Sequence, residues 1–366
     1  MDFALTEEQE QFAEAIRRFL MTEMTPELTR ELWSTETGRS DALWRQLADQ
    51  GLTALMVPQE QGGLGLGEVE WAPLAQACGY FALPEPLLDT ALVATGLLRD
   101  ALALGPDTAP HASARERCAT LLERIAAGDA RVAVAHPQER LVADAHVADA
   151  ILCAHAGAVH LLRRDQATLT ARTGVDPSRR LFELAWTPAP GTELIPAGTG
   201  LWDMALNRGA LGVAAQQLGL TQRMLDLAID YSAQRKQFGK AIGAYQAVKH
   251  LLADVAIQLE FAKPVLLRAA AALAHGRHGR HDRNLQAGLH VSHARVAAAR
   301  CAWTAARQAI QVHGAMGYTW ELDLQIFTKR AWALAGSWGD RAFHKARLGA
   351  HILDGEHDLG AGATFA

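Results

Sequence analysis

The chain has 366 residues, enough for two or three domains; 49% are apolar and can build a large core, and only 20% are charged, which excludes wholesale disorder. Its 35 basic and 40 acidic residues give a net charge of −5, so there is no electrostatic case for binding nucleic acid. The four cysteines lack metal-ligand or disulfide spacing, the N-terminus is unlike a signal peptide and no apolar run reaches membrane-spanning length, so we expect a soluble cytoplasmic protein.

Residues 1–128 are predicted to form an N-terminal helical domain. Thr6 and Gln9 have the spacing of a capping box, and they precede an apolar set with helical periodicity. The glycine-rich stretch 62–65 lacks the Gly-Lys-Ser/Thr of a phosphate-binding loop, so we interpret it as a tight turn. Further helices are predicted near 42–50, 68–79 and 89–100.

The hydrophobic period changes after Gly128, which predicts a middle β domain over 129–200. Short runs alternate with turns there, as in the strands of a small, mostly antiparallel sheet. The Pro/Gly-rich segment 187–200 is interpreted as a linker that closes this domain. The strands are expected at 132–135, 141–143, 150–154, 159–163, 168–172 and 181–186.

Residues 201–366 return to helical periodicity, so the fold class is mainly α. Long helices with alanine-rich faces are typical of an antiparallel four-helix bundle. The segment 275–283 is rich in Gly, His and Arg, and its one carboxylate, Asp282, comes with no cysteine, so we expect a solvated loop and no metal site. The helices are expected near 203–235, 241–275, 284–313 and 320–352.

Two stretches at the ends of these helices carry the chemistry. The first is Arg-Lys-Gln-Phe-Gly at 235–239, followed by Gln246, and the second is Gln-Val-His-Gly-Ala-Met-Gly at 311–317. Arginine holds a diphosphate in bidentate fashion, and glycine lets backbone N–H groups come close to it. Each stretch alone can also be an ordinary helix end. Together, in this order and spacing, they favour a site for a large anionic, aromatic cofactor.

These two stretches resemble the flavin-binding segments of the acyl-CoA dehydrogenase family. The resemblance implies that the first contacts the diphosphate and adenine region of FAD, and that the second reaches the flavin bound mainly by a neighbouring subunit. The segments 55–65 and 176–180 resemble further family stretches, and the order of helices, sheet and helical bundle is that of the family fold. The residues carried over to cofactor binding are Arg235, Phe238, Gln246, Gln311 and Gly314.

The resemblance also implies an activity and its partners. Family members remove a proton from the alpha carbon of an acyl-CoA thioester and a hydride from the beta carbon, which yields the 2,3-enoyl-CoA. FAD takes the hydride, a carboxylate takes the proton, and hydrogen bonds to the thioester oxygen stabilise the developing enolate. The implied partners are an electron-transfer flavoprotein or similar acceptor, and copies of the chain or a related subunit in a homotetramer or heterotetramer.

This sequence departs from the family pattern around the flavin ring. The family has a Thr-Glu-Pro-x-x-Gly-Ser-Asp segment, but the corresponding run 132–141 is not followed by Gly-Ser-Asp. No Trp-x-Thr strand precedes Asp176, and Ala315 stands where the family usually has a second glycine. Either backbone groups replace the missing side chains, or the subunit lacks a complete flavin site.

The base is the second departure. The commonest family position maps to Trp338 and the other to Gly209, and neither is an acid. Asp340 is the carboxylate nearest to either position, so it is the candidate catalytic base. The alternative interpretation of Asp340 is a helix N-cap, a role that Asp performs well.

Three interpretations remain open from the sequence. The chain is an FAD-dependent acyl-CoA dehydrogenase, a non-catalytic or half-site subunit that completes a partner's flavin site, or a flavin-family member with altered chemistry. Its gaps resemble bacterial members that pair a more complete subunit with a degenerate one, many of which act on bulky thioesters, including steroid side chains.

Overall fold

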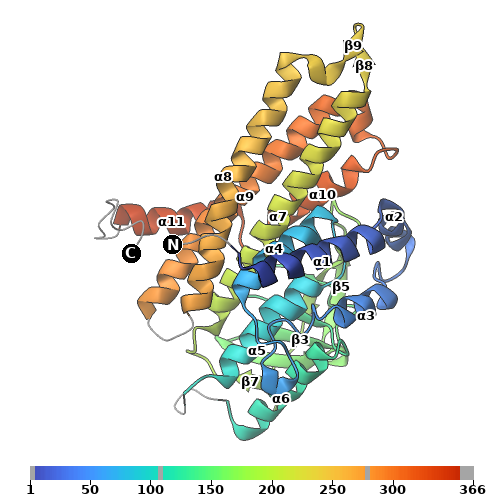
Figure 1. Cartoon of the computed structure of the whole chain (residues 1–366). Helices are drawn as coiled ribbons and strands as arrows, with labels where there is room; N and C mark the ends of the chain where they lie inside the picture. Colours follow the sequence, from blue (N-terminus) through green and yellow to red (C-terminus); the bar gives the residue numbers. More distant parts are fainter. Residues whose placement is uncertain (1–4, 106–109, 277–280, 355–366) are drawn as a thin grey trace. The chain divides into compact units, whose positions relative to one another are not determined.

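The computed structural model describes residues 5–105, 110–276 and 281–354 (Figure 1). Their contacts divide the chain into two compact units. Unit 1 consists of Met1–Arg18, Ala72–Ala82 and Val213–Ala366, and unit 2 of Phe19–Trp71 and Leu83–Gly212. Both units therefore draw on segments far apart in the sequence. The division into 1–128, 129–200 and 201–366 stays a prediction.

Unit 2 contains most of the N-terminal helices, and local sequence explains where they begin. Ser40 accepts the Leu43 N–H at the start of one helix and Thr25 the Leu28 N–H at the start of another, as N-cap residues do. The 62–65 stretch is a turn, as expected, because Gly62 and Gly65 have positive φ. The elements are α2 (Pro26–Ser34), α3 (Asp41–Asp49), η1 (Gln59–Gln61), η2 (Leu88–Ala94), α5 (Thr95–Leu102) and α6 (Ala112–Ala126).

The strands of unit 2 form two sheets where we expected one. One sheet has the order β1-β3-β4-β7, parallel only between β1 and β3, and the other is antiparallel with the order β2-β6-β5. A buried cluster that includes Ile151, Cys153 and Leu162 packs beside them. The strands are β1 (Val132–Ala135), β2 (Val142–Ala143), β3 (Ala150–His155), β4 (Ala158–Arg163), β5 (Thr168–Arg172), β6 (Leu181–Ala185) and β7 (Glu193–Ile195), with η3 (Arg164–Gln166) between β4 and β5.

The linker interpretation of 187–200 was wrong in one part. Within it, β7 pairs with β4, and its Leu194 and Ile195 are buried. The strand was not recognised in the sequence, because only three residues between the segment's prolines and glycines form strand hydrogen bonds.

Unit 1 contains the C-terminal four-helix bundle. The long helices α8 and α9 pack side by side, and α9 also packs against α10 and α11 (Figure 1). Three helices belong partly to each unit and contribute their 7–18, 72–80 and 213–234 portions here. The elements are α1 (Glu7–Glu23), α4 (Glu68–Tyr80), α7 (Leu201–Gln234), β8 (Lys236–Gln237), β9 (Lys240–Ala241), η4 (Ile242–Ala244), α8 (Gln246–Gly276), α9 (His281–His313), η5 (Gly314–Tyr318), α10 (Leu324–Leu334) and α11 (Arg341–Asp354).

Two details of unit 1 test the sequence predictions. The capping box is confirmed, because the Thr6 N–H donates to Gln9 Oε1 (2.9 Å) and the Gln9 N–H donates to Thr6 Oγ1 (3.3 Å). The single helix expected over 320–352 was wrong, because the chain leaves helical geometry between α10 and α11. Trp338 and Gly339 both have positive φ there, which no helix accommodates. The predicted loop at 275–283 lies partly outside the described residues.

The backbones of α4 and α7 touch in unit 1. A Cβ built on Gly219 would lie 1.9 Å from the backbone oxygen of Gln76, and one on Gly79 would lie 2.1 Å from that of Gln216. Only glycine permits this approach, since the obstructing atoms are backbone and cannot rotate away. The separation of the two helices is therefore fixed by these glycines.

We expect Gly219→Ala to destabilise the protein by about 1–3 kcal/mol or more, because the added methyl must push α4 from α7. Gly349→Ala is the matched control: this glycine lies in α11 with nothing within 4 Å of its Cβ position, so alanine should stabilise the helix by up to ~1 kcal/mol. Urea denaturation of both variants measures the difference. Equal stability of the two would contradict the close approach.

A cluster of charged side chains is buried in unit 2. The Arg208 guanidinium donates to Glu68 Oε1 from Nε (2.9 Å) and to Asp100 Oδ2 from Nη2 (2.6 Å). Arg99 Nη2 also donates to Glu68 Oε1 (3.3 Å). Arg208 and Glu68 are fully buried, so their charges are compensated inside the protein by each other and by Asp100 and Arg99.

The remaining sequence predictions concern cysteines, metals and membranes. All four cysteines are buried free thiols. In the part of the chain that the structure describes, no His, Cys, Asp and Glu side chains gather in threes as a metal site would require. Within the same residues, none of the helices is both long and apolar enough to cross a bilayer.

Candidate functional site

The stretch 235–239 forms a tight hairpin at the end of α7. Strands β8 and β9 pair in antiparallel fashion, and the two residues between them, Phe238 and Gly239, have φ of 51° and 83°. Positive φ at both central positions defines a type I′ turn, which favours glycine and is rare for phenylalanine. The Phe238 side chain is 91% exposed. A strained backbone conformation at an exposed Phe238 indicates that its side chain is positioned to contact a ligand.

The hairpin is held in place by its own surroundings. The Arg235 N–H continues the helix by donating to Tyr231 O (2.9 Å), and the Arg235 carbonyl accepts the Ile242 N–H (2.8 Å). The Tyr245 hydroxyl lies within hydrogen-bond distance of the Gln237 and Phe238 carbonyls. The Arg235 side chain itself is exposed. The exposed Arg235 guanidinium therefore projects from a hairpin whose backbone is held in place by hydrogen bonds.

The second stretch lies against the end of the same helix. The His313 ring stacks on the Tyr231 ring with centroids 4.3 Å apart and planes 24° from parallel. His313 is buried and its Nδ1–H donates to Ala309 O (2.7 Å), while burial lowers its pKa. His313 thus joins the end of α9 to the end of α7 through the stack on Tyr231. The structure brings both sequence stretches to one end of the bundle (Figure 1).

The other predicted cofactor residues lie at this end as well. Gln246 begins α8 and Gln311 lies in the last turn of α9, and both are exposed. Gly314 has φ of 62°, and nothing lies within 4 Å of its Cβ position. An exposed guanidinium, an aromatic ring, two amides and an open glycine fit the diphosphate and adenine part of FAD. Their assignment to FAD stays a prediction.

The corresponding segment of unit 2 does not offer the family's ring-side chemistry. His136 follows β1 at the start of the run that departs from the family pattern, and its Nε2–H donates to the Trp202 carbonyl (2.9 Å). Its Nδ1 accepts the Gln138 N–H (3.1 Å), so both ring nitrogens are engaged. His136 is buried, and burial lowers its pKa. This side chain stabilises the local fold. It does not replace the threonine or the glutamate that the family has in this segment.

The position to which the sequence resemblance maps the family's base is Trp338. Trp338 is 5% exposed, has φ of 54°, and its carbonyl accepts the Nε2–H of His344 (3.0 Å). His344 Nδ1 must then accept the hydroxyl of Ser292 (3.0 Å), because a neutral imidazole has one donor and one acceptor. Burial lowers the pKa of His344 to about 4, which keeps the imidazole neutral. The Trp338 backbone is therefore locked from inside unit 1.

Arg295 fixes the preceding residues. Its Nη2 lies within hydrogen-bond distance of the carbonyls of Leu334 (2.8 Å), Ala335 (2.9 Å) and Ser337 (3.2 Å), and Nη1 donates to Gln217 Oε1 (2.9 Å). A guanidinium at the end of α10 satisfies carbonyls that the helix leaves unpaired and interacts favourably with the helix dipole. The 335–339 segment is consequently rigid on both sides.

Asp340 lies directly after this segment. It is exposed, and its Oδ1 accepts the Phe343 N–H (2.7 Å) at the start of α11, as an N-cap does. A cap and a base are compatible for a carboxylate, since Oδ2 can take a proton while Oδ1 accepts from the backbone. The role of Asp340 as base stays a prediction.

Sequence reasoning missed the side chains that support these positions. Tyr231 lies one helical turn before Arg235, and Ser292, Arg295 and His344 lie on bundle helices without a motif around them. The helical spacing of Tyr231 and Arg235 was the available signal, since residues four apart share a face. Nothing local marks the other three, because their partners are backbone groups and side chains on other helices.

Comparison with known proteins covers most of the chain. Residues 6–101 match the acyl-CoA dehydrogenase N-terminal domain and residues 197–353 match the acyl-CoA dehydrogenase C-terminal domain. The acyl-CoA dehydrogenase IpdE2 of Mycobacterium tuberculosis is 31% identical over 89% of this chain and 91% of its own length. IpdE2 of Mycolicibacterium smegmatis is 30% identical over 95% of this chain and 100% of its own.

Solved structures share the fold. The ChsE4-ChsE5 complex of Mycobacterium tuberculosis matches with a TM-score of 0.81 at 23% identity, covering 98% of this chain and 100% of the matched one. Butyryl-CoA dehydrogenase of Megasphaera elsdenii matches with a TM-score of 0.78 at 19% identity over 96% and 100%. The chain belongs to the acyl-CoA dehydrogenase family, whose members are FAD-dependent oxidoreductases acting on a CH–CH bond of an acyl-CoA thioester.

Proposed function

We propose that this chain is the flavin-holding subunit of an acyl-CoA dehydrogenase that oxidises an acyl-CoA thioester to the 2,3-enoyl-CoA. The observation that carries the proposal is the Tyr231–His313 stack, which brings Arg235 and Phe238 to the same end of the bundle as Gly314. Two segments about 75 residues apart in the chain then present one guanidinium, one aromatic ring and one open backbone position. That set suits the diphosphate and adenine of FAD.

The chain's own residues bind and orient in this reaction. Bound FAD supplies the hydride acceptor. Arg235 neutralises the diphosphate, Phe238 covers the adenine, and Gln246 donates beside them, while Gln311 and Gly314 extend toward a flavin held by a neighbouring copy or related subunit. The α proton leaves to a carboxylate, for which this chain offers Asp340 through its uncapped oxygen.

A second arrangement is favoured by one specific observation. The family's base position holds a buried Trp338 with its backbone locked by His344, so no carboxylate occupies it. A related subunit then supplies the base, and this chain contributes FAD contacts to a heteromer. ChsE4-ChsE5 is a complex of two different chains, and a Tcur3481-Tcur3483 steroid enzyme also matches with a TM-score of 0.81 at 22% identity. By the same comparison, a bulky thioester is the proposed substrate class.

An electron-transfer flavoprotein is the proposed oxidant of the reduced enzyme, and the cytoplasm its proposed location. Reduced FAD must pass its electrons on before another turnover. A second flavoprotein can accept them, because a flavin takes up one or two electrons. Four buried free thiols agree with a reducing compartment.

The test is the flavin content, subunit composition and turnover of the protein purified from its native host. A yellow heteromer or homomer that reduces an artificial acceptor in the presence of an acyl-CoA is the expected result. A colourless preparation with no turnover of any acyl-CoA would refute the proposal. Activity that appears only with a related subunit selects the second arrangement.

We expect Arg235→Ala to lower FAD retention far more than Lys236→Ala. Arginine presents a fork that binds two phosphate oxygens together, while its neighbour offers a single ammonium. The measurement is the ratio of flavin absorbance to protein after gel filtration. Equal flavin content in both variants, with full occupancy in the parent, would show that the stretch is only a helix end.

A further inference from the structure

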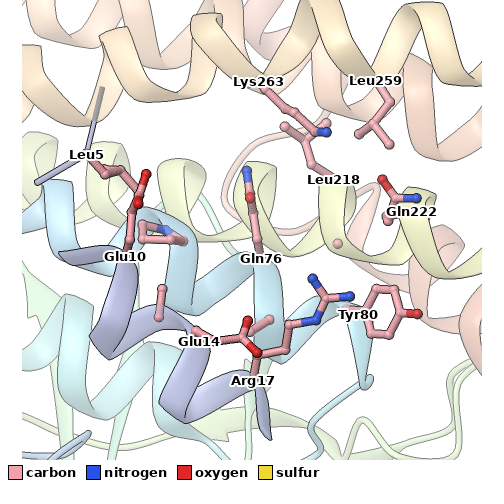
Figure 2. A pocket seen from close by; sticks show the side chains of 14 residues that line it. Leu5, Glu10, Glu14, Arg17, Gln76, Tyr80, Leu218, Gln222, Leu259 and Lys263 are labelled. Atoms are coloured by element: carbon pink, nitrogen blue, oxygen red, sulfur yellow. The ribbon is translucent and has the colours of Figure 1, made fainter. Parts of the chain in front are cut away.

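A pocket in unit 1 lies outside the candidate functional site. It has a volume of about 310 Å³ and lies between α1, α4, α7 and α8 (Figure 2). All of its lining residues belong to unit 1. None of them is a predicted FAD contact, and none belongs to the Trp338 segment. Its volume is at the lower end of the range for pockets that bind small molecules.

The floor of the pocket is apolar and rigid. Leu218 and Leu259 are buried, and Ala77 and Pro73 lie beside them on α4. Gly219, whose backbone contacts α4 at the closest approach of the two helices, belongs to the same floor. Because the backbones of α4 and α7 already touch, these two helices cannot move closer together to close the floor.

The rim carries charges of both signs. Glu10, Glu14 and Arg17 follow one face of α1 at helical spacing, and Lys263 lies across from them on α8 (Figure 2). Glu14 is within 3.8 Å of Arg18, and Lys263 pairs with Glu260. Two of the four rim charges are thus already compensated by neighbours outside the pocket.

The other two rim charges have no such partner. Among the described residues, neither Glu10 nor Arg17 has an ion pair, and the Arg17 guanidinium lies over the Tyr80 ring, 5.1 Å from its centroid. Within the same residues, the Gln76 side-chain amide makes no hydrogen bond, and it projects into the pocket (Figure 2). One anion, one cation and one amide therefore face the cavity and can form ion pairs or hydrogen bonds with a ligand.

The spacing of these groups defines the ligand's shape. Glu10 and Arg17 are seven residues apart on α1, which places their Cα atoms about 10 Å apart along the helix axis. Between them on α1 lie Ala13 and Glu14, whose carboxylate is paired with Arg18, above the apolar floor. A ligand with a single charge would leave one rim charge beside an apolar spacer, and a compact α-amino acid would not reach both ends.

We propose that this pocket binds a small zwitterion whose ammonium and carboxylate are separated by an apolar spacer, such as an ω-amino acid. The ammonium lies against Glu10, the carboxylate against Arg17 with help from the Gln76 amide, and the spacer covers the floor. The site is independent of FAD and of the acyl-CoA reaction, so it is open to ligand while the enzyme turns over.

The test uses three probes of equal length on the whole chain: ε-aminocaproate, caproate and n-hexylamine. Binding is measured by isothermal titration calorimetry and by saturation-transfer NMR. The expected result is that ε-aminocaproate binds about tenfold tighter than either singly charged probe, the factor for one charge-assisted contact. No binding of ε-aminocaproate, or equal affinity for all three, overturns the proposal.

Variants locate the site. Glu10→Gln should weaken ε-aminocaproate and n-hexylamine about tenfold and leave caproate nearly unchanged, and Arg17→Gln should weaken ε-aminocaproate and caproate about tenfold and leave n-hexylamine nearly unchanged. Glu8→Gln, on the same helix, and Arg300→Gln, exposed on α9, are the charge-matched controls, because neither residue lines the pocket. A loss of binding in the controls as large as in the pocket variants would place the ligand elsewhere. All four side chains are exposed, so folding is expected to be unaffected.

Discussion

Asp340→Asn is expected to lower kcat for acyl-CoA oxidation by about 10²–10⁴-fold in the chain acting alone, while FAD content and thermal stability stay at parental values. The amide cannot accept the α proton, but it can still accept the Phe343 N–H and so preserve the start of α11. Turnover is measured with an artificial electron acceptor, flavin by absorbance, and stability by thermal unfolding.

Asp340→Ala is the control for the cap. It should show the same loss of turnover and an added destabilisation of about 1 kcal/mol, because alanine leaves the Phe343 N–H without its acceptor. Full activity of Asp340→Asn assigns the base to another chain. In that case a carboxylate of the related subunit, replaced by its amide, must carry the loss of turnover.

Arg208→Ala is expected to destabilise the protein by about 3–5 kcal/mol, the largest effect on folding that we predict. The substitution removes the shorter of the two ion pairs of the fully buried Glu68 carboxylate with Arg208 and Arg99, and it deprives Asp100 of its 2.6 Å bond. Denaturant unfolding followed by circular dichroism measures the change, and little folded protein at 37 °C is a compatible result.

Arg45→Ala provides the comparison for Arg208. Arg45 and Asp129 form an ion pair at 3.0 Å with both side chains more than half exposed, so solvent screens it and its loss should change stability far less. If the two substitutions cost the same, the buried cluster contributes no more than a surface pair. The role of the buried cluster would then be limited to specifying that the segments around Glu68, Asp100 and Arg208 pack against one another.

Most helices and strands were predictable because short stretches of local sequence mark where they begin and end. The strands at 132–135 and 168–172 match to the residue, since alternation and flanking turns mark them locally. The capping box at Thr6 was equally local. The break between α10 and α11 was signalled only by the N-cap interpretation of Asp340, because the positive φ of Trp338 depends on buried His344 and Arg295, which hold the neighbouring carbonyls.

The site divides in the same way. Arg235 and Gly314 were found from short motifs, and the structure brings their segments together, but the stack that joins them depends on Tyr231, which no motif contains. The pocket at Glu10 and Arg17 was invisible in the sequence. Its walls come from four helices, and a cavity is a property of how they pack.

The locked tryptophan has a consequence for anyone who wishes to redesign this chain. A glutamate at 338 would have to take the same positive φ and place a charge where the present side chain is 5% exposed. The bonds from His344 and Arg295 end on backbone carbonyls, so they hold this conformation whatever side chain stands at 338. A single Trp338→Glu substitution is therefore expected to destabilise the loop, and a carboxylate can be accommodated there only if its surroundings are changed with it.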